Sequence, residues 1–169
     1  QWSLLSTGHW LPAATDHGIY LGVNSATAAN LLDDYEEGLW TPTVADLGSN
    51  VTISMNSSYN ELAYTKVGNL VTFGGVLVVA STSGSWASGD TVTITLPFTT
   101  LDTNDQAAKV GSLIGTYNTD WTQGTSPYLQ IPEGVSTGYC YVSTDNSTTG
   151  RVQVSGGSQI YFGGHFYAA

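Results

Sequence analysis

Aromatic side chains set among amides and carboxylates are the residues of this sequence best suited to chemistry. They are Trp86, Trp121 and Tyr128, with Asn118 and Asp120 just before Trp121. An apolar ring stacks on the face of a sugar while amide and carboxylate oxygens bind its hydroxyls. Because turn residues surround these rings, we expect them on loops and predict a receptor or glycan site within 111–147, centred on Trp121. The alternative for each ring is packing, at the end of the fold or at a subunit contact.

Three carboxylates near these aromatics raise the alternative of an enzyme. Glycoside hydrolysis uses two carboxyl groups at a defined separation, and Asp120, Glu133 and Asp145 are the candidates. Nothing in the sequence singles out a pair among them. We therefore expect no catalytic residue and no enzymatic activity, with a polysaccharide hydrolase as the alternative.

Metal and nucleophile chemistry lack the required spacing. The acidic run 33–37 offers oxygen ligands for Ca²⁺, but it lacks the spaced ligands and the glycine of an EF-hand loop. We interpret it as a hinge whose carboxylates cap a helix end or pair across subunits. His9, His17 and His165 are far apart, and no GxSxG elbow is present. We expect no metal and no cofactor.

Composition excludes several classes of partner. Lys and Arg total 3 against 13 Asp and Glu, which gives a net charge of −10. A phosphate backbone or an anionic membrane surface requires a basic face, so we expect no nucleic acid or membrane partner. No run of about 18 apolar residues exists, and we expect no membrane insertion. Cys140 is the only cysteine, and we interpret it as a small buried hydrophobe.

The body of the chain has the pattern of strands and turns. Residues 91–96 alternate apolar and polar, whereas 69–80 is apolar on both faces and must lie between two layers or at a subunit interface. The remaining predicted strands are 51–55, 61–67, 110–118, 135–143, 151–154 and 159–167. The predicted core includes Val71, Phe73, Val92, Ile94, Leu96 and Phe162.

Short strands separated by turn residues indicate an all-β protein of jelly-roll-like β-sandwich type. We assign the β-sandwich to residues 39–169. Residues 1–38 differ from this pattern, and we interpret them as a short extended stem with one short helix over 25–37, ended by Gly38.

Two stretches carry a resemblance to known proteins. Residues 32–43, LDDYEEGLWTPT, and 64–75, YTKVGNLVTFGG, resemble a family of C-terminal domains from phage tail fibres and viral spikes. Its junction motif is approximately LDDYEEGTWTPT, so Leu39 stands where the family has Thr. Weaker similarities lie at 8–16, 20–22, 96–99 and 160–166, and 111–150 matches nothing in the family pattern.

The resemblance implies a function and a location. It implies a homotrimeric fibre or spike tip, exposed on the virion, joined to other virion fibre or tail proteins. Such a tip attaches to a host cell-surface receptor, commonly a glycan and otherwise a protein. Segment 111–150 would then be the host-specific part, since distal loops of these families meet different hosts. A tailspike enzyme and a purely structural fibre or capsid cap are the alternatives.

Overall fold

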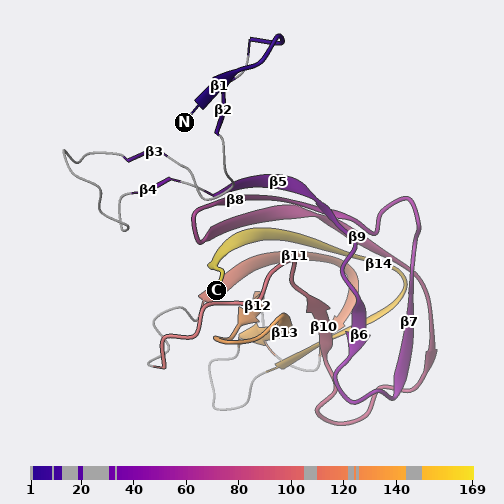
Figure 1. Ribbon diagram of the computed structural model, residues 1–169. Helices are drawn as coiled ribbons and strands as arrows, with labels where there is room; N and C mark the ends of the chain where they lie inside the picture. Colours follow the sequence, from indigo (N-terminus) through magenta and orange to yellow (C-terminus); the bar gives the residue numbers. More distant parts are fainter. Residues whose placement is uncertain are drawn as a thin grey trace.

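The computed structural model describes residues 2–8, 10–12, 19–20, 31–32, 34–104, 110–121, 124, 126–143 and 150–169 (Figure 1). These residues form strands, turns and loops without a helix, which confirms the all-β prediction. In the described part of the chain, no helix is long and apolar enough to cross a membrane.

The N-terminal strands form two small antiparallel sheets of their own. Strand β1 (Trp2–Leu4) pairs with β2 (Trp10–Pro12), and β3 (Ile19–Tyr20) pairs with β4 (Leu31–Leu32). Both hairpins lie outside the main sheet (Figure 1).

The helix predicted over 25–37 is wrong where the structure describes it. Leu31–Leu32 is strand β4, and Tyr35 to Glu37 belong to strand β5 (Tyr35–Trp40). Residues 25–30 and Asp33 lie outside the described residues. Six consecutive residues of β5 pair with β8, and this pairing overrides the weak helical preference of the leucines and glutamates. The main sheet therefore begins at Tyr35 rather than at Leu39.

Ten strands of the described chain form the main sheet, and every pairing is antiparallel. Their order is β5-β8-β9-β14-β11-β12-β13-β10-β6, with β7 paired to the second half of β9. The strands that follow β5 are β6 (Val44–Asp46), β7 (Val51–Met55), β8 (Leu62–Val67), β9 (Leu70–Gly84), β10 (Val92–Thr95), β11 (Val110–Trp121), β12 (Ser126–Ile131), β13 (Thr137–Ser143) and β14 (Gly150–Tyr167).

The layers of the fold belong to one curled sheet, whereas a β-sandwich consists of two sheets that are not hydrogen-bonded to each other. Residues 159–167 of β14 pair with β9, whereas Arg151 and Gly150 pair with β13. Strand β11 pairs with both halves of β14, across an irregularity at Asn118. Since β14 is one long strand rather than the two predicted at 151–154 and 159–167, the sheet curls around the core without a break (Figure 1).

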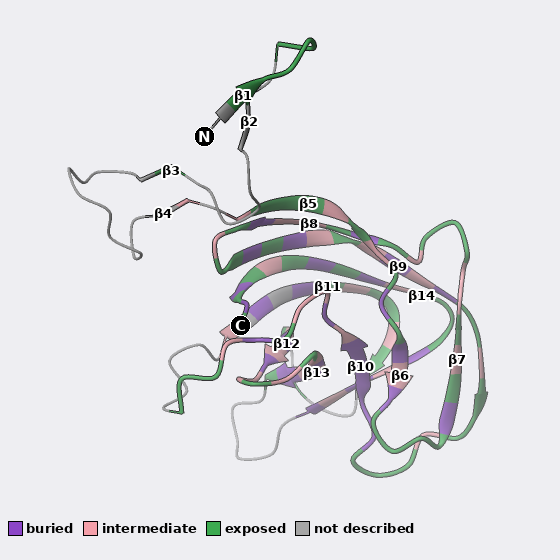
Figure 2. Cartoon of the chain, viewed as in Figure 1, coloured by how far each residue is buried: buried purple, intermediate pink, exposed green. Residues whose placement is uncertain are grey.

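The predicted core is confirmed. Each of its six members is 7% exposed or less, and all belong to one hydrophobic cluster: Val71, Phe73, Val92, Ile94, Leu96 and Phe162. Buried and exposed residues alternate along the first half of β9 and the second half of β14, as Figure 2 shows. The core therefore lies on one face of the curled sheet, and we call the face turned away from it the outer face.

A buried threonine hydroxyl ties three strands together. Thr91, which is fully buried beside β10, donates its hydroxyl hydrogen to the carbonyl of Cys140 in β13. The same oxygen accepts a hydrogen bond of 3.1 Å from the backbone N–H of Val152 in β14. These bonds lie next to the point where β13 and β14 pair, at Tyr141 and Arg151.

Replacing this hydroxyl tests its role in closing the sheet. In Thr91→Val the shape is kept, but the buried Cys140 carbonyl and Val152 N–H lose a partner. We expect the free energy of unfolding to fall by about 1–3 kcal/mol, measured by urea denaturation. Thr52→Val, on the exposed face of β7, is the control and should change it by less than about 0.5 kcal/mol. Equal stability of the two variants would contradict the role of the Thr91 hydroxyl.

Candidate functional site

Three tyrosine rings and one guanidinium group meet on the outer face of β12, β13 and β14. The rings of Tyr139 and Tyr141 are stacked, with centroids 6.2 Å apart and planes 7° from parallel. The Tyr128 ring lies 6.1 Å from that of Tyr141 at 52°. The guanidinium carbon of Arg151 is 4.8 Å from the centre of the Tyr141 ring. We call Tyr128, Tyr139, Tyr141 and Arg151 the tyrosine cluster.

Strand alternation and register bring the cluster together. In β13 the two tyrosines alternate with Cys140 and Val142, which are fully buried. Successive side chains of a strand point to opposite faces, so both rings point outward. Antiparallel register then places Tyr128 directly opposite Tyr141 on one side, and Arg151 opposite it on the other.

Polar side chains border the rings. Gln130 lies opposite Tyr139 in the register of β12 and β13. In β14, Gln153 follows Arg151 on the same face, and Asp120 of β11 lies opposite it. Directly opposed residues share a face of the sheet. The cluster therefore presents flat apolar rings beside amide, carboxylate and guanidinium groups, a combination suited to the ring faces and hydroxyls of a sugar.

The predicted rings Trp121 and Tyr128 lie on strands, where the sequence indicated loops, whereas Trp86 lies in the loop before β10. Tyr128 lies in β12 and is part of the cluster, and Asp120 lies on the same face in β11. Asn118 is exposed and has a φ of 54°, at the irregularity of β11. The backbone of Trp121 pairs with Val152, while its side chain lies outside the described part of the structure. The difference arises because this segment pairs with other strands, and the turn residues in its sequence do not reveal such pairing.

Trp86 lies apart from the cluster. It precedes β10, is half-buried and packs against the hydrophobic core. Its indole N–H donates a 3.1 Å hydrogen bond to the carbonyl of Val154. The structure thus does not bring Trp86 together with Tyr128, and its indole N–H is used within the fold.

The carboxylates considered for hydrolysis are not brought together either. Glu133 follows the end of β12 at which Ile131 pairs with Val110, whereas Asp120 lies at the opposite end of β11. A hydrolytic pair needs carboxyl groups about 5–10 Å apart, and a strand rises about 3.4 Å per residue. Asp120 and Glu133 are therefore too distant to form such a pair, and Asp145 lies outside the described residues.

The acidic run pairs within the chain. Asp34 forms an ion pair with Lys66, and Glu36 accepts a hydrogen bond from the hydroxyl of Tyr64, both across the β5–β8 region. Glu37 accepts one of 2.7 Å from Tyr35. Each of these two hydrogen bonds raises the pKa of its tyrosine, chiefly because the neutral phenol is the donor. The run thus anchors β5 to β8 and does not cap a helix.

Sequence reasoning missed three of the four members of the cluster. The alternation Tyr139-Cys140-Tyr141 was a usable signal, because it places two rings on one face of a strand. The positions of Tyr128 and Arg151 beside them depend on register between distant segments, which the sequence does not show.

Comparisons of the chain with protein-family models, curated proteins and solved structures found no match. The resemblance to tail-fibre and spike domains therefore stays a prediction.

The cysteine beneath the cluster gives a test of its packing. Burial raises the pKa of the Cys140 thiol to about 12, whereas its ordinary value is 9.0. The thiolate is the reactive form, so we expect no labelling by a thiol reagent at pH 8 in the folded protein, and full labelling in urea. Between about pH 9 and 12 the unfolded thiol ionises and the folded one does not, so the free energy of unfolding should decrease as the pH rises. Rapid labelling of the folded chain would contradict this packing.

Proposed function

We propose that this chain is the receptor-binding tip of a phage tail fibre or viral spike, a homotrimer that attaches to a host surface glycan through the tyrosine cluster. The observation that carries the proposal is the stacked pair Tyr139–Tyr141, flanked by Tyr128 and Arg151. The tip would bind without cleaving its receptor.

The position of the cluster supports this assignment. All four members lie within β12, β13 and the first part of β14. Much of this segment lies in 111–150, the part of the chain without similarity to the family motifs, where a host-specific surface is expected. In the sheet order β12 and β13 are also far from β5, the strand that follows the N-terminal hairpins. A stem that leads into β5 would thus join the sheet several strands away from the proposed receptor site.

The motif resemblance supports the location and the oligomeric state. The junction stretch 32–43 includes β5, and the stretch 64–75 includes residues 64–67 of β8; these two strands pair along their whole length. In the proposal this pair is the shared base of a jelly-roll-like head, and variable strands are added beyond it. Three weak sites on one rigid tip would bind a cell surface by avidity.

Removing the central ring tests the binding site. In Tyr141→Ala the partner of both neighbouring rings and of Arg151 is lost. We expect binding on a glycan array to weaken by about 1–3 kcal/mol per site, roughly 5–150-fold in affinity. The fold should be kept, because Tyr141 is only partly buried. Tyr59→Ala, an exposed tyrosine outside the cluster, is the control and should bind normally. Unchanged binding by Tyr141→Ala would show that the receptor site lies elsewhere.

The ring predicted from sequence as the centre of the site needs its own test. If Trp121 belongs to the receptor site, as the sequence predicts, Trp121→Ala abolishes cell attachment while the assembly and its melting temperature stay nearly unchanged. Loss of the fold would identify Trp121 as a core residue, and normal attachment would exclude it from the site.

Incubation of the wild type with host glycans distinguishes the candidate functions. Binding without shortening of the glycan supports the adhesin, and shortened products support the enzyme. If neither is observed, a structural cap is supported.

A further inference from the structure

The outer face of β5, β8, β9, β14 and β11 is a second surface with its own character. The register places Val76 of β9 opposite Tyr161 of β14, and Gly115 of β11 on the far side of that tyrosine. The next rows toward the end of β14 hold Gly74 and Gly163, then Thr72 and His165, then Leu70 and Tyr167. These residues face away from the core, because their neighbours Val71, Phe73, Ile160, Phe162 and Phe166 are buried.

Large apolar side chains are concentrated on this face. Seven of the twelve large hydrophobic side chains that are exposed in the described part of the chain belong to it: Tyr35, Leu39, Val67, Leu70, Tyr117, Tyr161 and Tyr167. Five strands and nine residues along β9 cover roughly 700 Å² at ordinary sheet spacings. A stable interface needs about 800 Å² per partner, so the face is of the right order.

Acidic residues avoid the centre of this face. The chain has 13 Asp and Glu, yet the strands β8, β9 and β14 contain none of them. Glu37 lies at the margin, where it is bonded to Tyr35. Lys66, the cation of β8, is buried and paired with Asp34.

This charge distribution favours a second copy of the chain as the partner of the outer face. Copies of a chain with a net charge of −10 repel one another over most of their surface. They can approach closely only where carboxylates are absent, and interface cores are depleted of charged residues in the same way. A basic partner would instead be drawn to the acidic remainder of the surface.

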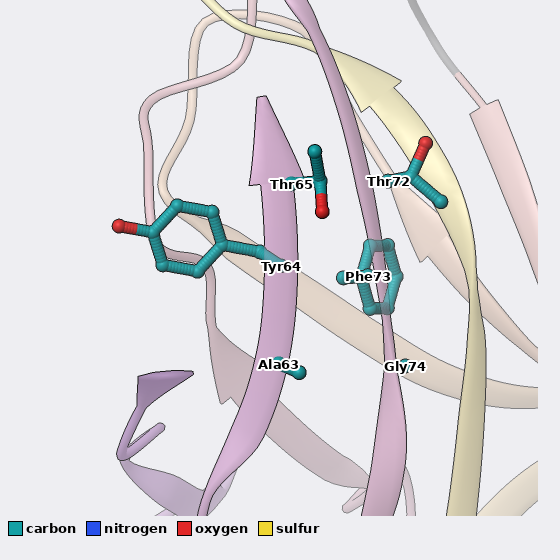
Figure 3. A pocket seen from close by; sticks show the side chains of 6 residues that line it. All are labelled: Ala63, Tyr64, Thr65, Thr72, Phe73 and Gly74. Atoms are coloured by element: carbon teal, nitrogen blue, oxygen red, sulfur yellow. The ribbon is translucent and has the colours of Figure 1, made fainter. Parts of the chain in front are cut away.

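The face is also shaped for insertion of a side chain. A hollow of about 360 Å³ lies over β8 and β9 (Figure 3). Its lining includes Ala63, Thr65, Thr72 and Gly74, which face outward, and also Tyr64 and Phe73, whose side chains lie on the core face. Ala63 and Gly74 lie opposite each other and have almost no side chain to fill it. Gly163, on the other side of Gly74, faces open space. Tyr161 and Leu70 project on either side of this row of small residues.

We propose that this outer face is where copies of the chain pack against one another, with the exposed rings of one copy seated over the small-residue row of the next. The inference deepens the proposed homotrimer and rests on it for the number of copies. It does not depend on what the tyrosine cluster binds.

A single carboxylate placed on this face should separate the copies. We expect the full wild-type chain to assemble at micromolar concentration in size-exclusion chromatography with light scattering. Tyr161→Glu and Gly163→Glu should both have the mass of one chain. Both changes are compatible with the fold, since Tyr161 is 47% exposed and a Cβ at Gly163 meets no atom within 4 Å.

A matched control separates the effect of a substitution on this face from the effect of the added charge itself. Leu47, equally exposed at 47%, lies between β6 and β7, away from the face. Leu47→Glu adds the same charge and should assemble as the wild type does. Far-UV circular dichroism confirms that each variant is folded.

The outcomes distinguish the two proposals. A monomeric wild type, or assembly retained by both face variants, would overturn this inference. A wild-type dimer that both variants dissociate would support the surface and contradict the trimer. Loss of glycan binding in Tyr141→Ala tests only the receptor site, so either proposal can fail without the other.

Discussion

The constraint on which this structure depends is the shared use of β14. Its later residues lie between β9 and β11, and its first residues lie between β11 and β13. Four residues, 155–158, face a single residue of β11, Asn118, where the register shifts. Ser158 holds this irregularity, because its buried hydroxyl donates to the carbonyl of Asn118 and accepts a 2.9 Å hydrogen bond from Ser155 N–H. The shift lies between the part of β14 that pairs with β9 and the two residues that pair with β13.

The local pattern of apolar and polar residues predicted the strands that alternate strongly. It failed for segments whose structure is determined by pairing with distant strands. The alternation of 91–96 and the two-sided run 69–80 correspond to β10 and β9, whose inward residues are buried. Strand β12 was missed, because Ser126 and Pro127 have turn chemistry and the segment is short. Proline is tolerated near the start of a strand, and β11 and β13 supply the hydrogen bonds on either side. The helix predicted over 25–37 failed for the same reason, since β8 pairs with β5.

The candidate site shows the same division between local and long-range information. That Tyr139 and Tyr141 share a face follows from their spacing alone. That Tyr128 and Arg151 lie beside Tyr141 follows from two separate registers, one of them across the β13–β14 connection. Sequence reasoning therefore selected the segment that contains β12 and β13, and the aromatic side chains that the cluster also uses. It could not define the geometry of the cluster, which needs the position of three strands at once.

The same strand supplies both surfaces of the molecule. Arg151 and Gln153, before the irregularity, belong with the tyrosine cluster, whereas Tyr161 and Gly163, after it, belong to the neutral outer face. Leu113 of β11 pairs with Gly163 of β14 and with Tyr128 of β12, so the two surfaces adjoin along the sheet. The single arginine of the chain lies in the first half, and the second half has no residue of fixed charge. In the two proposals, the receptor surface contains the polar groups that recognise hydroxyls, and the centre of the packing surface lacks carboxylates. One curled strand with its charge at one end contributes residues to both proposed surfaces, and residues 155–158 separate these two contributions.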